Sequence, residues 1–127
     1  MAKSLVVANW KMNPASIKEA VLLARKVESG TLRQGNVEIV VAPPFPFLIQ
    51  VGSILKRARL GAQDISGFAG GLYTGEVSGR QLRSLKVSHA IIGHSERKIH
   101  LGETDVMINR KVRLALKQGI KPVLCVG

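Results

Sequence analysis

The sequence predicts an α/β fold in which short parallel strands alternate with helices. Five short apolar runs, rich in Val and Ile, recur along the 127 residues. The runs are continuous rather than alternating, which is typical of strands covered on both faces. Segments with helical spacing separate them, so each crossover should be right-handed and the sheet parallel. With 46% apolar and 21% charged residues, the chain has the composition of one globular domain, and we expect residues 1–127 to form it.

The five expected strands are short and follow one another at regular intervals. They are Leu5–Asn9, Val37–Ala42, Leu60–Gln63, His89–Gly93 and Val123–Val126. Two folds have this order of elements: an open doubly wound sheet, and part of a closed barrel of eight βα units. In both, the chemistry takes place at the carboxyl ends of the strands, so functional side chains should lie there.

Two helices are expected in the first half of the chain. Ser16 and Glu19 form a capping-box pattern ahead of a helix that Gly30 is placed to end. A weaker helical pattern covers Phe45–Lys56, with Pro46 near its first turn.

Two more helices are expected in the second half. Ser78 and Gln81 form another capping box before a short helix that ends near residue 85. Thr104 is placed to cap a longer helix that Gly119 ends. The apolar stripe of this longer helix comprises Ile108, Val112, Ala115 and Leu116.

The chain is strongly basic, with 19 Lys and Arg against 8 Asp and Glu, a net charge of +11. Such a charge is typical of nucleic-acid binding or of sites for anionic substrates. The basic residues are scattered, however, and no aromatic residue interleaves with the densest cluster, Lys56, Arg57 and Arg59. We therefore favour a solvated basic surface over nucleic-acid binding.

The sequence also favours a cytoplasmic protein without a membrane anchor. Cys125 is the only cysteine and cannot form an internal disulfide, which fits a reducing compartment. No apolar stretch approaches the roughly 20 residues of a membrane span. No apolar core of signal-peptide length precedes Lys11.

Polar side chains follow the first expected strand. Asn9 and Lys11 lie on the same side of it, and an amide with an ammonium group at a strand end can hold an oxyanion or a phosphate. A polar turn before Pro14 is the equally favoured alternative.

A long loop of residues 64–77 follows the third expected strand. It contains four glycines, and also Phe68, Leu72 and Tyr73, apolar groups that a solvent loop does not need. Long loops in compact domains are usually functional or form interfaces, so we interpret it as a partner surface. A flexible loop is the alternative.

His94 follows the fourth expected strand and precedes Ser95, Glu96 and Arg97. Backbone N–H groups at a helix start favour a neutral imidazole, which can donate an N–H to a carbonyl and transfer protons. The histidines lack Cys or carboxylate neighbours at metal-ligand spacing, and the sequence has no GxGxxG or GKT/GKS fingerprint. We therefore expect neither a metal nor a nucleotide cofactor.

Four motifs together resemble the triosephosphate isomerase family. They are residues 8–13 (ANWKMN), residues 61–63 with 73–78 (GAQ and YTGEVS), residues 91–97 (IIGHSER) and residues 102–105 (GETD). Their order and spacing match the family over essentially all 127 residues. The resemblance implies part of a (β/α)8 TIM barrel, an N-terminal half-barrel of four βα units and a fifth strand. It also implies cofactor-free interconversion of dihydroxyacetone phosphate and glyceraldehyde 3-phosphate through an enediolate, a step of glycolysis and gluconeogenesis.

The resemblance implies roles for five residues at the strand ends. Lys11 would be the electrostatic partner of the substrate and would bind it together with Asn9. His94 would be the neutral electrophile that polarises the carbonyl, supported by Ser95 and Glu96. This family is itself the usual illustration of a neutral catalytic histidine, so the general rule lends no independent support.

The resemblance further implies a homodimer of completed barrels. Thr74 would reach into the active site of the neighbouring subunit, with Met12, Gln63, Glu76 and Arg97 in the same interface. The family's glutamate base lies beyond the sixth strand, outside these 127 residues. We therefore expect this chain alone to be inactive, and the C-terminal half to come from a second polypeptide, from further residues of a longer chain, or from pairing of two half-barrels. A non-catalytic half-barrel that binds phosphate is the alternative function.

Overall fold

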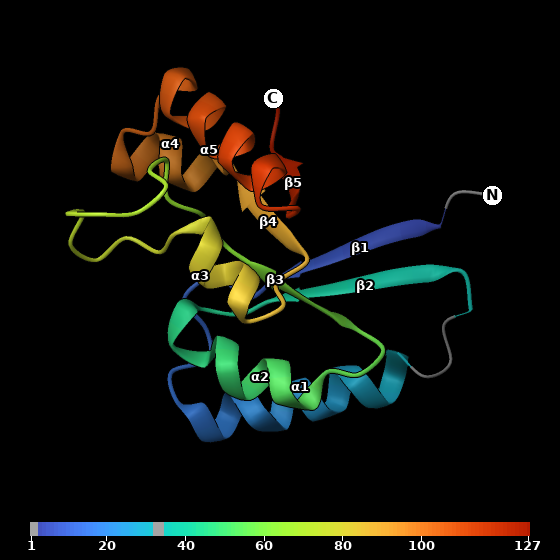
Figure 1. Cartoon of the computed structure of the whole chain (residues 1–127). Coiled ribbons are helices and arrows are strands. Elements are labelled where there is room, and N and C mark those ends of the chain that lie inside the picture. Colours follow the sequence, from blue (N-terminus) through green and yellow to red (C-terminus); the bar gives the residue numbers. More distant parts are fainter. Residues whose placement is uncertain (1–2, 32–34) are drawn as a thin grey trace. The chain divides into compact units, whose positions relative to one another are not determined.

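The structure, a computed structural model, describes residues 3–31 and 35–127. The chain forms two compact units, residues 1–63 and 64–127, and each is described by itself. In both units strands and helices alternate, and the strands pair in parallel, as predicted (Figure 1). Among the described residues, no helix has the length and apolar character needed to cross a bilayer.

The first unit contains three parallel strands and the helices between them. Its elements are β1 (Ser4–Asn9), α1 (Ile17–Thr31), β2 (Val37–Ala42), the 3-10 turn η1 (Phe45–Phe47), α2 (Leu48–Ile54) and β3 (Arg59–Ala62). The register of β1 on β2 runs from Ser4↔Val37 to Asn9↔Ala42, so both strands end at the same level. The carboxyl ends of β1 and β2 therefore bring their following residues together.

Two helix boundaries in the first unit differ from the prediction. The helix α1 begins after Ser16, whose Oγ accepts the Glu19 N–H at 3.2 Å, as predicted. It does not end at Gly30 but at Thr31, whose hydroxyl donates to the carbonyl of Val27 at 2.8 Å and so satisfies a group of the last turn. The second predicted helix begins as the 3-10 turn η1 and ends at Ile54, two residues early.

The second unit contains two parallel strands and three helices. Its elements are α3 (Gly79–Ser84), β4 (His89–Ile92), α4 (Ser95–Leu101), α5 (Asp105–Lys117) and β5 (Lys121–Leu124). The capping box predicted before α3 is complete, and the Thr104 hydroxyl accepts the Met107 N–H at 3.3 Å at the start of α5. The helix α4 is additional to the four that the sequence predicted.

Two predictions for the second unit are wrong. The last strand is Lys121–Leu124 rather than Val123–Val126, because the ladder begins where the Lys121 N–H donates to the Ser88 carbonyl, and backbone pairing needs no apolar side chain. Leu116 was predicted in the apolar stripe of α5 but is 61% exposed.

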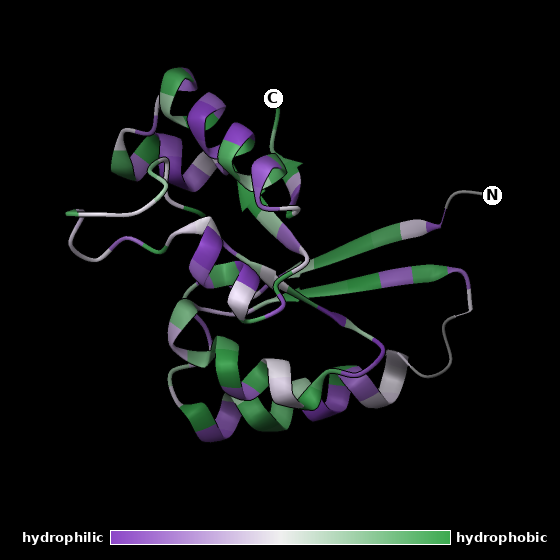
Figure 2. Ribbon diagram, in the orientation of Figure 1, coloured by the Kyte–Doolittle hydropathy of each residue, from purple (hydrophilic) through white to green (hydrophobic). Residues whose placement is uncertain are grey.

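The strands differ in burial. All four residues of β4 are buried, whereas β1 exposes Leu5 and Val6 by about half, and β5 exposes Leu124 similarly. The prediction of strands covered on both faces therefore holds for β4 and fails for β1 and β5. Figure 2 shows apolar residues along β1 and β2 and mixed polarity on the helices.

Candidate functional site

The end of β1 forms a tight turn around Lys11. The Lys11 backbone is left-handed, with φ of 57°, a conformation that costs a non-glycine residue about 1–2 kcal/mol. Its N–H donates to the Asn9 Oδ1 at 2.9 Å, and its carbonyl accepts the Gln63 Nε2 at 2.8 Å. The same Gln63 amide donates to the carbonyl of Ala42, the last residue of β2, at 2.9 Å. Three strand ends thus hold an exposed lysine in a strained conformation, which is typical of functional positions.

The turn at the end of β1 is compatible with both interpretations of the sequence, a polar turn and a site for an anionic oxygen. It is a polar turn, since the Asn13 N–H donates to the Trp10 carbonyl at 3.2 Å. It also brings an asparagine and a lysine to one strand end, residue types suited to an anionic oxygen. Gln63 fixes the Lys11 backbone, a role that the sequence analysis did not predict.

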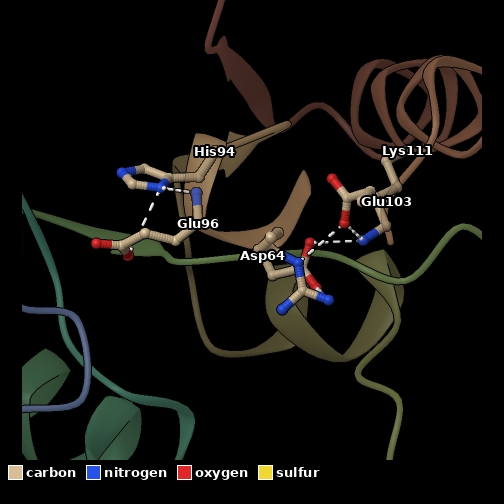
Figure 3. Close-up of polar contacts among 6 residues, drawn as sticks. Asp64, His94, Glu96, Glu103 and Lys111 are labelled. Carbon is tan, nitrogen blue, oxygen red and sulfur yellow. Dashed lines mark hydrogen bonds and ion pairs between the residues drawn. The ribbon is translucent and has the colours of Figure 1, made fainter. Parts of the chain in front are cut away.

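His94 lies between β4 and α4 and is the N-cap of α4. Its Nδ1 accepts the Glu96 N–H at 3.1 Å, so that nitrogen carries no proton and the neutral ring carries its proton on Nε2 (Figure 3). The Glu96 Oε2 lies 3.6 Å from the same Nδ1, which is too long for a hydrogen bond and would be an ion pair only with a protonated ring. We favour the neutral ring because a protonated Nδ1 would face the Glu96 N–H.

Gly93 sets the direction in which the chain leaves β4. Its φ of 74° is left-handed, and a Cβ at this position would lie 3.2 Å from the Ile108 Cδ1. Glycine is therefore required both by the backbone and by the close approach of α5. The two residues after His94 differ in position, since Ser95 is exposed at the start of α4 whereas Glu96 folds back toward the ring.

Four charged residues of the second unit form an ionic cluster. Asp64, Glu103 and Lys111 are buried (Figure 3), and Arg97 is partly exposed. The Lys111 Nζ lies 2.8 Å from the Asp64 Oδ1 and 2.7 Å from the Glu103 Oε2. The Arg97 Nε lies 2.9 Å from the same Glu103 oxygen, and its Nη2 lies 3.1 Å from the Asp64 Oδ2. The side chains of Lys111 and Glu103 are 4% and 1% exposed.

The sequence analysis missed this ionic cluster, although one signal was present. Lys111 lies three residues after Ile108 and four before Ala115, on the buried face of α5. A lysine at such a position requires buried carboxylates as partners. The carboxylates came from positions 64 and 103, whose proximity the sequence does not reveal.

Burial and charge act in opposite directions on the two carboxyl groups. Burial raises the pKa of Asp64 above its ordinary value, although Lys111 and Arg97 oppose the rise. Burial acts in the same direction on Glu103, but its hydrogen bonds from Lys111 and Arg97 outweigh it and hold the pKa of that carboxyl below its ordinary value. The buried Glu103 Oε1 has no hydrogen-bond partner among the described residues.

The loop of residues 64–77 is closed at its base and carries an aromatic pair. The Ser66 N–H donates to the Val77 carbonyl at 2.9 Å. The rings of Phe68 and Tyr73 stack with centroids 3.8 Å apart. Leu72 beside them is fully exposed. The loop thus presents apolar side chains to solvent, and its role as a partner surface stays a prediction.

The five residues expected in a subunit interface differ in their surroundings. Met12 is 92% exposed, and Thr74 and Glu76 are also exposed. Gln63 and Arg97 instead make the internal contacts described above.

Within residues 3–31 and 35–127, no three His, Cys, Asp or Glu side chains gather as a metal site requires. Burial raises the pKa of the partly buried Cys125 thiol.

The chain is similar to known proteins over almost its whole length. A family model described as triosephosphate isomerase matches residues 4–127. Curated relatives of that name include those of Saccharopolyspora erythraea (43% identical, 97% of this chain and 49% of the relative), Coxiella burnetii (44%, 98% and 49%) and Endomicrobium trichonymphae (41%, 100% and 51%). The chain therefore spans about half the length of the curated relatives it matches.

Proposed function

Since the chain belongs to the triosephosphate isomerase family, we propose that it supplies the Lys11 and His94 part of an isomerase active site. The reaction interconverts dihydroxyacetone phosphate and glyceraldehyde 3-phosphate through an enediolate. It moves one proton between neighbouring carbons and one between their oxygens, and it needs no cofactor. The fold class supports the proposal, because the family match and the parallel strand–helix units both correspond to part of a TIM barrel.

The observation that supports the proposal best is the hydrogen bond from the Glu96 N–H to the His94 Nδ1. It leaves the Nε2–H as a donor at the end of β4, where a substrate carbonyl would accept it. A neutral imidazole can give up that proton to the developing oxyanion and recover one from the neighbouring hydroxyl. Glu96 holds the ring through its backbone, and Ser95 belongs to the same turn.

Lys11 would provide the positive charge that the substrate dianion and the enediolate require. Its backbone is held by Asn9 and Gln63, so the point from which the side chain extends is set before the substrate binds. A preorganised charge stabilises a transition state better than a mobile one, because it needs no reorganisation during the reaction. We propose Asn9 as a second substrate contact beside it.

The proton on carbon must be removed by a base that this segment does not supply. We propose that the glutamate base, together with the rest of the barrel, comes from residues beyond these 127, in the same polypeptide or in a second one. The exposed apolar residues of β1 and β5 support this, because a completed barrel would cover both strands. We also propose a cytoplasmic homodimer, in which Thr74 and the exposed residues of its loop enter the neighbouring subunit's site.

The test is an isomerase assay on the protein that contains both this segment and the rest of the barrel. A coupled assay follows the conversion of glyceraldehyde 3-phosphate. Lys11→Ala and His94→Gln should each lower kcat about 100- to 1000-fold, as expected when one preorganised donor to an oxyanion is lost. The matched controls are Lys18→Ala and His100→Gln, which make the same substitutions at an exposed lysine and an exposed histidine outside the proposed site. Full activity in His94→Gln would contradict the proposal. Stabilisation by phosphate without turnover would instead indicate the non-catalytic half-barrel.

A further inference from the structure

The helix that carries His94 lacks the usual means of attachment. None of the seven residues of α4 is buried, and its apolar residues Ile99 and Leu101 are 75% and 63% exposed. Helices of globular proteins are normally fixed by an apolar face packed on the core. A helix this short is also unstable by itself. Among the described residues, hydrophobic packing therefore does not hold α4, or the turn before it that contains His94.

Arg97 makes side-chain contacts between α4 and other parts of its unit. Its guanidinium binds the Glu103 Oε2 at 2.9 Å and the Asp64 Oδ2 at 3.1 Å. The Arg97 carbonyl accepts the Glu103 N–H at 3.2 Å, and its own N–H donates to the His94 carbonyl at 2.9 Å. Arg97 thus links the first turn of α4 to the ionic cluster.

Lys111 in turn holds the two carboxylates that Arg97 binds. Its helix α5 is packed through Ile108 and Ala115, so the ammonium group is a fixed point. Without Lys111 the two carboxylates would repel each other with one guanidinium between them. The order of contacts therefore runs from the packed helix α5 through Lys111, the carboxylates and Arg97 to the turn of His94.

We infer that Arg97, Glu103 and Lys111 are positioning residues, which hold α4 so that the His94 Nδ1 accepts the Glu96 N–H and the Nε2–H points outward. The ionic cluster does for α4 what an apolar face does for other helices. That the ring then acts on a substrate rests on the proposed function, whereas its position and tautomer do not.

The test is a spectroscopic measurement on the whole protein that contains this chain, with 15N-labelled histidine. A ring held in one neutral tautomer gives well-separated Nδ1 and Nε2 signals, whereas exchange between tautomers brings them together. The variant is Arg97→Gln, which removes the link to α4 and leaves Lys111 with both carboxylates. The control is Arg113→Gln, an exposed arginine of α5. The His100→Gln variant identifies the signals of the exposed His100 ring, because they disappear from its spectrum.

In Arg97→Gln the separation of the two His94 signals should shrink. Amide hydrogen exchange in α4 of this variant should accelerate about 10- to 100-fold relative to α5. Lys111→Met should have the same effect where it folds, and Arg97→Lys should restore part of the wild-type spectrum. An unchanged His94 spectrum and unchanged α4 exchange in folded Arg97→Gln would overturn the inference. Because no measurement uses isomerase activity, failure of the proposed function would leave this result intact.

Discussion

Replacing Lys111 with methionine keeps an unbranched side chain, shorter by one atom, and removes one of the two cations of the ionic cluster. The lysine makes two short charged contacts, at 2.8 and 2.7 Å, and its side chain is only 4% exposed. Losing one partner of a buried ion pair typically costs about 3–5 kcal/mol, because the remaining charges stay buried. We expect Lys111→Met to lower the free energy of unfolding by this amount at pH 7. That is a large share of the roughly 5–15 kcal/mol of a typical domain.

The pH dependence of this loss distinguishes an electrostatic cause from simple packing. Glu103 has a lowered pKa, so it contributes stability above the ordinary value of 4.5, and that stability is lost as the pH falls through the folded value. In Lys111→Met the pKa of Glu103 should rise, so the folded variant takes up a proton at a higher pH. The difference in stability between wild type and variant should therefore narrow as the pH falls from 7 toward 4.5.

Urea unfolding between pH 7 and 4.5 measures both effects, since urea is uncharged. The control is Arg113→Met on the exposed face of the same helix, which should change stability by less than about 0.5 kcal/mol. A loss below about 1 kcal/mol for Lys111→Met, or a loss that does not vary with pH, would refute the electrostatic argument.

Three further predictions use the same unfolding measurement. Burial alone would raise the pKa of Glu28, but the hydrogen bonds that its carboxylate accepts from backbone N–H groups outweigh burial and lower this pKa. Glu28→Gln should therefore lower the free energy of unfolding at pH 7, and the loss should fade below about pH 4.5. A loss that stays constant with pH would contradict this prediction. Gly93→Ala should lower the free energy of unfolding by about 2–3 kcal/mol, because Gly93 has a left-handed φ and the Ile108 side chain lies close to it. Gly30→Ala, in a helix with open space around this position, should raise the free energy of unfolding by about 0.5 kcal/mol. Equal effects of the two substitutions would contradict this reasoning. Lys86 has a φ of 63°, so Lys86→Gly should be neutral or stabilise by up to about 1 kcal/mol, and a clear loss would mean that the side chain has a role.

Much of the fold was predictable because its signals are local. A capping box such as Ser78 with Gln81 lies within four residues, and the structure contains both of its hydrogen bonds. Continuous apolar runs located all five strands, with β2 at its predicted boundaries. The boundaries that failed depended on other segments, as at β5, where pairing with β4 starts the strand at Lys121.

The places of Lys11 and His94 at strand ends were predictable from the sequence, but the contacts that hold them were not. The motifs around Lys11 and His94 pointed to the strand ends, and the structure places both residues there. The contacts that fix these side chains were not predictable. Gln63 reaches the Lys11 carbonyl across 52 positions, and Lys111 reaches Asp64 across 47.

The sequence by itself determined the order of strands and helices, the caps, the family and the identity of the residues at the strand ends. These follow from spacing along one stretch of chain, where the physical interaction and the pattern are both local. Only the tertiary structure decided which charges are buried, that α4 buries none of its residues, and that an ionic cluster contacts it. Burial and partnership depend on which distant segments meet, and the free energy of a charge depends on its surroundings more than on its residue type.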